Sequence, residues 1–343
     1  MAGLAGATLD TIWFVLIAVL FTGYFFLEGF DYGVGILALF LGHTDKERRA
    51  VLATIGPVWD ANEVWLITAG GAMFAAFPRW YATLFSGFYF ALALLLLALI
   101  LRGVALEFRS KMAGTRWRGT WDGIIFGSSL VPPVIWGMAM ANMLTGVPID
   151  AQMNFVGSFF TLITPYTVLG GLGAAALFTL HGALYVALKT SDDLRERANR
   201  YAMVIGAVAT ALYFAFVILT YFYTSFPRHM GIDPGAIPVL AAVAMLAVRE
   251  LLVRRRYGLA FAVNGLVIVL SSITVFMALS PRLMLSTLNP AWSLTITNAA
   301  SNPYSLRVMT ILALAALPLV LAYQAWTYWV FRRRISLQDT FHY

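Results

Sequence analysis

Long runs of apolar residues dominate the sequence and restrict it to one fold class. Hydrophobic residues make up 61% of the 343 residues, and charged residues make up only 11%, whereas about a quarter of a soluble domain is charged. Many runs exceed the roughly 20 residues that a helix needs to cross about 30 Å of hydrocarbon. We therefore expect an all-α polytopic membrane protein.

Nine segments are expected to span the membrane, within a single transmembrane domain over residues 1–343. The seventh is short, and Gly235 and Pro238 lie at its start. The first eight spans can form two four-helix units with the ninth added, although the sequence shows no convincing internal repeat. The expected spans are 9–41, 50–77, 80–108, 119–145, 161–189, 200–224, 236–253, 258–280 and 304–331.

The basic residues are distributed unequally between the two sides of this arrangement. One side holds 19 of the 23 Lys and Arg residues, and the other holds only Arg79, Arg228, Arg282 and Arg307. The positive-inside rule then predicts an outside N-terminus and a cytoplasmic C-terminus. The net charge of +7 follows from this topology, so it does not indicate nucleic acid. Residues 1–10 contain no Lys or Arg, and we expect the first span to be retained and not cleaved as a signal peptide.

The stretch GPVWDANEVW, residues 56–65, departs from the apolar pattern inside the second expected span. It contains Asp60, Asn62 and Glu63 directly after a Gly-Pro pair. Because proline removes a helical hydrogen bond and glycine adds flexibility, the helix is expected to loosen one turn before Asp60. A span with this composition is expected to hold a polar site.

The first expected span carries a second acidic pair at the same spacing. Glu28 and Asp31 are three residues apart, as are Asp60 and Glu63, and this spacing places each pair on one helical face. Asp31 and Asp60 each lie 11 residues from the cytoplasmic end of their span, which is about 16 Å. The two spans are antiparallel neighbours, so four carboxyl groups can occupy two matched levels.

These carboxyl groups can act in three ways. A charged residue at the centre of a span costs about 2.5–3.5 kcal/mol on insertion scales, so the four are expected to face protein or water. Carboxyl groups that exchange protons at matched depth form a proton relay. They can instead close structural contacts, for example with Arg102 in the third span. Carboxylates without a nearby histidine can also bind a hard metal ion, although the spacing does not require one.

The chain offers few candidate haem ligands. It has no cysteine, and three of its four histidines, His43, His229 and His342, fall in expected loops or the tail. His181 lies in the fifth expected span, where an interhelical hydrogen bond is the expected role. A span that binds haem needs an axial ligand such as His or Met, so we expect no cofactor and no metal on this chain.

Several stretches resemble subunit II of the cytochrome bd quinol oxidases. They are EGFDYGVG, ERRAVLATIGPVWDANEVWLITAGGAMFAAFP, FSGFYFALALLLLALILRGVALEFRSK, TRWRGTWD and GSSLVPPV, in matching order over about residues 10–150. The ending AWTYWVFRRRI also fits. The region from 150 to 300 is less distinctive, but its number of spans agrees.

The resemblance implies a subunit of a complex in the bacterial cell membrane that oxidises quinol and reduces oxygen to water. It implies a proton gradient built by proton uptake from the cytoplasm, without pumping. Two b-type haems, haem d and the quinol site would lie in a larger subunit I. The chain itself would form two four-helix bundles plus one peripheral helix beside subunit I. A small single-span subunit is a further candidate partner, with quinone and membrane lipids around the complex.

The resemblance also carries over to individual positions. It places Asp60 in a hydrophilic channel from the cytoplasm, matches Asp31 to the family's G-F-D motif, and puts Glu28 beside it. Glu63 is assigned to the proton pathway from its depth alone. Residues expected at the channel wall or the subunit contact are Trp59, Asn62 and Arg102.

Two other classes of function remain possible. A proton-coupled secondary transporter also uses intramembrane carboxylates and broken helices. Such transporters usually show breaks in matching positions of two repeats, whereas here the acids and breaks gather in one half of the chain. A purely structural subunit, with each acid satisfied locally, is the third possibility.

Overall fold

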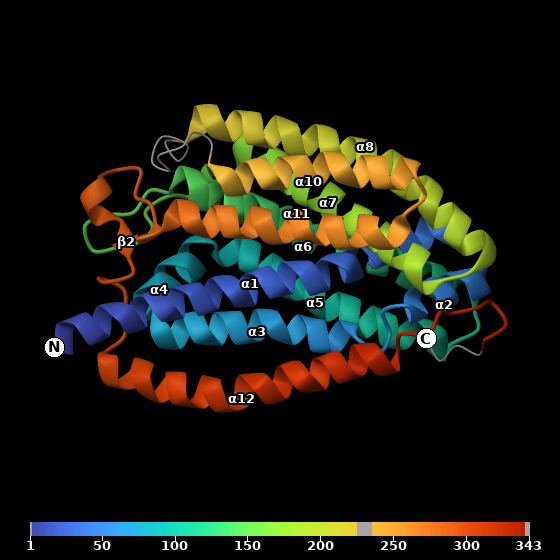
Figure 1. The fold of residues 1–343 in the computed structure, drawn as a ribbon, viewed down its shortest axis with the longest axis horizontal. Coiled ribbons are helices and arrows are strands. Elements are labelled where there is room, and N and C mark those ends of the chain that lie inside the picture. Colours follow the sequence, from blue (N-terminus) through green and yellow to red (C-terminus); the bar gives the residue numbers. More distant parts are fainter. Residues whose placement is uncertain (1, 225–234, 340–343) are drawn as a thin grey trace.

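The computed structural model describes residues 2–224 and 235–339, and its long helices run side by side along one axis (Figure 1). His229, Arg228 and His342, which the sequence placed in loops or the tail, lie outside the described residues. The elements are α1 Ala2–Leu41, α2 Asp45–Ala53, α3 Trp59–Ala76, α4 Pro78–Gly87, α5 Tyr89–Phe108, η1 Arg109–Lys111, α6 Thr115–Thr145, η2 Phe159–Leu162, α7 Pro165–Lys189, α8 Asp192–Tyr223, α10 Ala236–Val253, α11 Tyr257–Leu279, β1 Arg282–Met284, η3 Pro290–Trp292, β2 Leu294–Thr295 and α12 Pro303–Val330.

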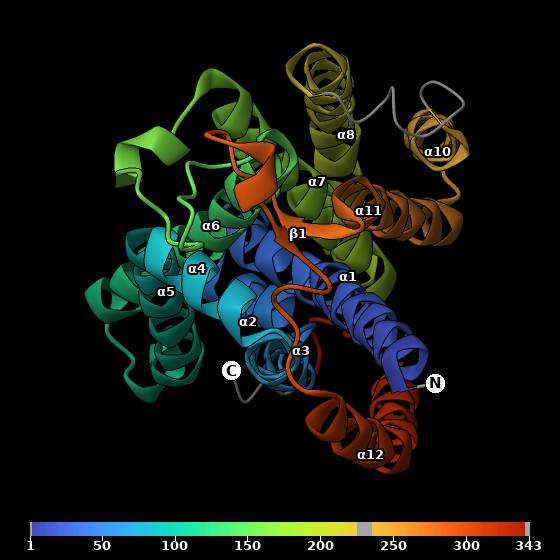
Figure 2. The same cartoon turned by 90° about the vertical axis from the view of Figure 1, so that its left-hand side faces the viewer.

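The helices form two bundles and one peripheral helix, as the sequence and the resemblance predicted. In the first bundle, α1 packs on α3 and α6, and α5 packs on α6. In the second, α7 packs on α8 and α11, and α10 packs on both α8 and α11. The contacts of α7 with α1 and α6 join the two bundles, while α12 lies outside them next to α1 and α3 (Figure 2).

Within the described residues, eight helices are long and apolar enough to cross a membrane. They are α1, α5, α6, α7, α8, α10, α11 and α12. α3 packs alongside α1 (Figure 1), and its 18 residues make it about 27 Å long. The polar residues in the first two turns of α3 lower its mean hydropathy, so α3 does not reach the apolar content of the other eight helices.

Two expected spans are divided in the structure. The segment 50–77 consists of the end of α2, turns over residues 54–58, and α3. The segment 80–108 lies in α4 and α5, which are separated at Phe88. A Cβ at Gly87, the last residue of α4, would lie 2.7 Å from the ring of Phe155, so this end of α4 is packed too closely for a larger residue.

Local sequence signals set several helix starts. At α2, Thr44 and Glu47 form a capping box in which each side chain accepts from the other residue's backbone N–H. α7 begins with Thr164 as its N-cap and Pro165 in its first turn. This start lies a few residues later than the expected 161 because residues 159–162 form the short helix η2.

Glycines allow the two bundles to approach closely. A Cβ at Gly33 of α1 would lie 2.2 Å from the carbonyl oxygen of Phe178 and 2.8 Å from the Cα of Gly182 in α7. A Cβ at Gly137 of α6 would lie 2.3 Å from the carbonyl oxygen of Gly170. Since real Cβ atoms do not approach this closely, α7 can pack on α1 and α6 only where both helices have glycine.

The two ends of the molecule are closed differently. At the end that holds the N-terminus of α1, β1 pairs antiparallel with β2 and forms a small cap (Figure 1). At the opposite end, Arg109 is buried and pairs with Asp122 at 2.5 Å and Asp45 at 3.0 Å. Glu47 of α2 contacts Arg197 of α8 in an ion pair. These ion pairs hold α2 against α6 and α8.

Candidate functional site

The interruption between α2 and α3 positions the polar residues of the second expected span. Pro57 lies in the turns over residues 54–58, and it lacks the N–H that a continuous helix would use. A new helix therefore starts at α3, with Asp60, Asn62 and Glu63 in its first two turns. The N-terminus of a helix favours negative charge through its dipole, so this geometry suits the two acids.

Two carboxyl groups of α1 are completely buried against α3 and α5. Glu28 forms an ion pair with the Arg102 guanidinium of α5, and Asp31 accepts a hydrogen bond from Asn62 Nδ2 at 2.7 Å. Arg102 Nη2 also lies 3.0 Å from Oε1 of Glu63. Glu28 and Asp31 have no exposed surface, and Arg102 is 1% exposed. The structure thus brings five of the seven predicted site residues together from three helices.

Arg102 carries more hydrogen-bond donors than its protein surroundings use. Its Nε and Nη1 are buried and have no hydrogen-bond partner in the described part of the chain. Buried polar groups normally bond to protein or to ordered water. The single positive charge of Arg102 faces the carboxyl groups of Glu28 and Glu63, so these three groups are neutral together when one carboxyl group is protonated. The arrangement can therefore hold one exchangeable proton.

Asn62 connects this cluster to the peripheral helix α12. Its Oδ1 accepts a hydrogen bond from Tyr328 Oη at 2.9 Å and one from Gln324 Nε2 at 3.3 Å. Gln324 Oε1 in turn accepts from Trp65 Nε1 at 2.9 Å. Gln324 and Tyr328 were not among the residues predicted from the sequence. Their spacing of four residues, which puts two polar groups on one face of an apolar helix, is the signal that could have identified them.

Asp60 lies apart from the buried cluster, so the expected meeting of all four carboxyl groups at two matched levels is not formed. Its side chain is exposed, and Asn62 takes the place next to Asp31. Two residues correspond to about 200° around a helix axis, so Asp60 and Asn62 point to nearly opposite sides. Asp60 and Glu63 instead share the side of α3 that faces a cavity.

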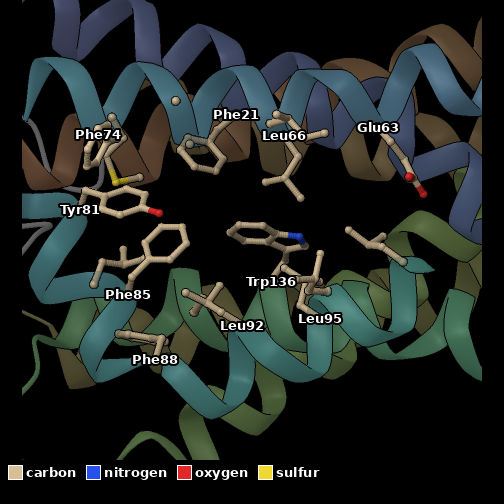
Figure 3. A pocket seen from close by; sticks show the side chains of 18 of the residues that line it. Phe21, Glu63, Leu66, Phe74, Tyr81, Phe85, Phe88, Leu92, Leu95 and Trp136 are labelled. Carbon is tan, nitrogen blue, oxygen red and sulfur yellow. The ribbon is translucent and has the colours of Figure 1, made fainter. Parts of the chain in front are cut away.

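This cavity has a volume of about 980 Å³ and lies between α3 and α5. Figure 3 shows Glu63 at one end and Phe74, Tyr81 and Phe85 at the other, with Trp136 projecting between them. Trp59 also lines the cavity, and its ring packs against Gly103 of α5. A cavity with an apolar and aromatic lining and few polar groups suits an apolar molecule or segment. Its acidic end joins it to the cluster around Arg102.

His181 is packed inside the second bundle and not in this cluster. Its Nδ1 lies 3.2 Å from Asn264 Nδ2 of α11, which is the interhelical hydrogen bond that the sequence predicted. Its ring stacks on Phe261, with centroids 4.4 Å apart, and also contacts Phe26 and Phe30. Aromatic rings from α1 and α11 therefore surround His181. Among the described residues, no group of three or more His, Asp and Glu side chains could hold a metal ion.

Comparison with known proteins gives consistent matches over nearly the whole chain. Residues 9–331 match the family described as cytochrome bd terminal oxidase subunit II. Cytochrome bd ubiquinol oxidase subunit 2 of Bacillus subtilis is 42% identical over 337 residues, covering 98% of this chain and 100% of that protein. Cytochrome bd-I ubiquinol oxidase subunit 2 of Escherichia coli K12 is 36% identical and covers 96% of this chain and 95% of that one. The fold is similar to a chain of the bd oxidase from Geobacillus thermodenitrificans, with a TM-score of 0.76 at 16% identity over 94% of this chain and 98% of that one.

Proposed function

The chain belongs to the cytochrome bd terminal oxidase subunit II family, and we propose that it conducts protons from the cytoplasm toward the oxygen-reducing site of subunit I. It is a multi-pass membrane subunit of a terminal quinol oxidase and has a partner subunit I. Because the chain belongs to this family, we reject the alternative that it is a secondary transporter. We place two b-type haems, haem d and quinol oxidation in subunit I, where those groups supply the electron transfer and oxygen chemistry.

The observation that carries this proposal is the shared guanidinium of Arg102. Its one charge lies between Glu28 and Glu63, and Asp31 is buried on the same helix as Glu28. A protein gains little stability from burying several acids around one base, because desolvation offsets the attraction. Intramembrane carboxyl groups in such an arrangement are typical of proton relays. The unsatisfied Nε and Nη1 of Arg102 favour water in the cluster, and water is what connects carboxyl groups in a relay.

The contacts suggest the order of the residues in the route. Asp60 is exposed and lies one turn from Glu63 on α3, so it is suited to receive protons first. Glu63 and Glu28 meet at Arg102, and Asp31 follows one turn away on α1. We propose that protons pass along Asp60, Glu63, Glu28 and Asp31. Asn62 bonds to Asp31 and accepts a bond from Tyr328, which links the last residue of the route to α12.

The exposed surface supports a second role as a scaffold. α12 is almost entirely exposed, with Ile311, Leu314 and Leu319 each more than 60% accessible. α5 also presents many exposed apolar side chains. Contiguous apolar surface of this extent needs lipid or another membrane protein against it. We propose that part of this surface, near α3 and α12, holds subunit I and that lipids and quinone cover the rest.

The proton route is tested by Asp31→Asn and Glu28→Gln in the intact oxidase. An amide oxygen still accepts the bond from Asn62, so Asp31→Asn should assemble with a normal haem spectrum. Proton exchange is lost, and turnover should fall by about tenfold or more. Oxygen uptake with reduced quinol measures the rate, and absorbance measures haem per complex.

Glu250→Gln is the matched control, because Glu250 is an exposed acid whose partner is Arg254 one turn away. It should keep the rate of the unmodified oxidase. If Asp31→Asn and Glu28→Gln both assemble and turn over at that rate as well, the proposed route is wrong. If both lose haem, the cluster is structural.

The proposal also implies that the isolated chain binds no haem. A heterologously expressed, detergent-purified chain should show no haem absorbance, while the complex with subunit I should. Stoichiometric haem on the folded isolated chain would contradict the assignment of all haem ligands to the partner.

A further inference from the structure

Two buried tyrosines lie beside Arg102 and take no part in the carboxyl route described above. Tyr24, Glu28 and Tyr32 follow one another at intervals of four residues on α1, so they share one helical face. Tyr24 and Tyr32 have no exposed surface. Their hydroxyl groups form a hydrogen bond with each other across the turn that carries Glu28.

The Arg102 guanidinium forms a cation–π contact with the ring of Tyr32. The guanidinium carbon of Arg102 lies 4.8 Å from the ring centroid of Tyr32. At that distance the negative face of an aromatic ring attracts a cation, and the attraction is strongest where water is excluded. Arg102 is 1% exposed, so this contact is made in such a place.

Tyr32 is itself held on two sides. Its hydroxyl is bonded to Tyr24, and the two rings meet edge to face with centroids 6.4 Å apart. Its ring also stacks on Phe178 of α7, with an angle of 23° between the planes. Tyr24 in turn contacts Trp136 of α6 at 5.8 Å. The orientation of Tyr32 is therefore fixed by three helices.

This support matters because the guanidinium has few other restraints. Arg102 has a long side chain with many rotamers, and its Nε and Nη1 have no hydrogen-bond partner in the described part of the chain. Its two ion pairs, to Glu28 and Glu63, both involve Nη2 and leave the rest of the group free to pivot. The contact with the Tyr32 ring is a further restraint on the position of the guanidinium.

We propose that Tyr32, oriented by Tyr24, is a positioning residue that holds the Arg102 guanidinium between Glu28 and Glu63 and so keeps these two carboxyl groups within reach of proton exchange. The inference rests on the proposed proton route. A small displacement of Arg102 would favour one carboxylate over the other and separate the two acids. Displacements of about 1 Å can slow a reaction by as much as about a hundredfold.

The test compares three variants in the intact oxidase with one control. Tyr32→Leu removes the ring below Arg102, while Tyr32→Phe and Tyr24→Phe keep the rings and remove the hydroxyl bond. Phe25→Leu is the control, because Phe25 is buried beside Tyr24 and Trp136 and loses an aromatic ring in the same way. Turnover, the KM for quinol, haem content and the solvent deuterium isotope effect on turnover are measured for each.

Tyr32→Leu should lower kcat by about tenfold, leave the KM for quinol unchanged and raise the deuterium isotope effect, because proton transfer then limits the rate. Tyr32→Phe should retain most of the activity, since the ring remains, and this rescue separates positioning from packing. Tyr24→Phe should give a small decrease with a raised isotope effect. Phe25→Leu should change neither kcat nor the isotope effect by more than about twofold.

Two outcomes would overturn the inference. The first is a Tyr32→Leu oxidase that matches Phe25→Leu in rate and isotope effect. The second is an unchanged isotope effect in Tyr24→Phe when Tyr32→Leu does not assemble. In either case a slow Asp31→Asn oxidase would keep the proton route itself valid, whereas a fast Asp31→Asn oxidase would reject the route.

Discussion

Arg102 determines which acidic residues of the site lie together. The sequence identified Glu28, Asp31 and Glu63 from their spacing and depth, and it left open a pairing with Arg102 that the structure now shows. Asp60 does not join these residues, because counting residues from a span end gives depth but not rotation about the helix axis. That rotation depends on where α3 restarts after Pro57. Tyr24 and Tyr32 were missed, since tyrosines in a span give no signal until Arg102 is placed beside them.

Asp60→Asn is the residue-level prediction for the entrance of the route. Asp60 is exposed on α3, so the variant should assemble with the normal haem content. It loses the ability to exchange a proton, and turnover should fall by about tenfold or more. Asp60→Glu should recover part of the rate. Quinol-driven oxygen uptake checks these rates.

Asp193→Asn serves as the control, because Asp193 is an exposed acid on α8 outside the cluster and carries the same change of charge. Its rate should match that of the unmodified oxidase. An Asp60→Asn oxidase with the same rate as this control would remove Asp60 from the proton path. Loss of haem in Asp60→Asn would assign it a structural role.

At the level of helices, the sequence predicted where most spans lie but not every position where they break. Length and apolar content identify α7, α11 and α12 within a few residues, and the Gly-Pro pair predicted a weak point before Asp60. The break between α4 and α5 at Phe88 was not predicted. It depends on Phe155, which reaches Gly87 from a loop far along the chain, and contacts of that kind leave no local pattern.

The crossing of α1 and α7 predicts a specific effect of Gly33→Ala. The added methyl group would lie 2.2 Å from the Phe178 carbonyl oxygen, so α1 and α7 must separate. Overpacking of this kind costs about 1–3 kcal/mol, and the thermal midpoint of the purified oxidase should fall. In Gly119→Ala the new Cβ has no neighbour within 4 Å, and the change to a better helix former should be neutral or stabilising. Equal midpoints for the two variants would contradict the tight crossing.

The ion pair between α2 and α8 predicts a dependence on pH. The hydrogen bond from Arg197, together with backbone N–H groups of Thr44 and His43, lowers the pKa of Glu47 to about 2. The folded pKa is below the ordinary value near 4.5, so the folded state binds the proton less well than the unfolded chain does. The stabilisation is therefore complete above about pH 4.5 and is lost as the pH falls toward 2.

Glu47→Gln removes this stabilisation, so its thermal midpoint should be lower than that of the unmodified oxidase at pH 7. The difference between the two midpoints should shrink as the pH approaches 2. Glu250→Gln removes an exposed ion pair and should behave like the unmodified oxidase at every pH, because such pairs contribute little. A difference between Glu47→Gln and the unmodified oxidase that grows on acidification would have the wrong sign and would reject the argument.

On the scale of the whole molecule, the main feature is the position of α12 outside the two bundles. The sequence predicted two bundles with one helix outside them, and the structure has that arrangement (Figure 2). The attachment of α12 could not be predicted, because it depends on few contacts. These include the bonds from Gln324 and Tyr328 to Asn62 and the bonds from Lys189 Nζ to the carbonyl oxygens of Phe331 and Arg333. α12 can therefore present most of its surface to other molecules while remaining tied to the site.

The orientation in the membrane is the prediction for the molecule as a whole. The N-terminus of α1 and the C-terminus of α12 lie at opposite ends (Figure 1), and 19 of the 23 basic residues belong to the loops and span ends on the C-terminal side. Because positively charged loops are retained in the cytoplasm, the cap of β1 and β2 should face outward.

The chain has no cysteine, so the labelling of a single introduced cysteine shows on which side of the membrane that position lies. Thr287→Cys and Gln152→Cys, both at exposed positions on the cap side, should react with a membrane-impermeant maleimide in spheroplasts. Ala113→Cys, exposed between η1 and α6, should react only in inverted vesicles. The reverse pattern would require the opposite orientation, and the proton route would then start from the outside.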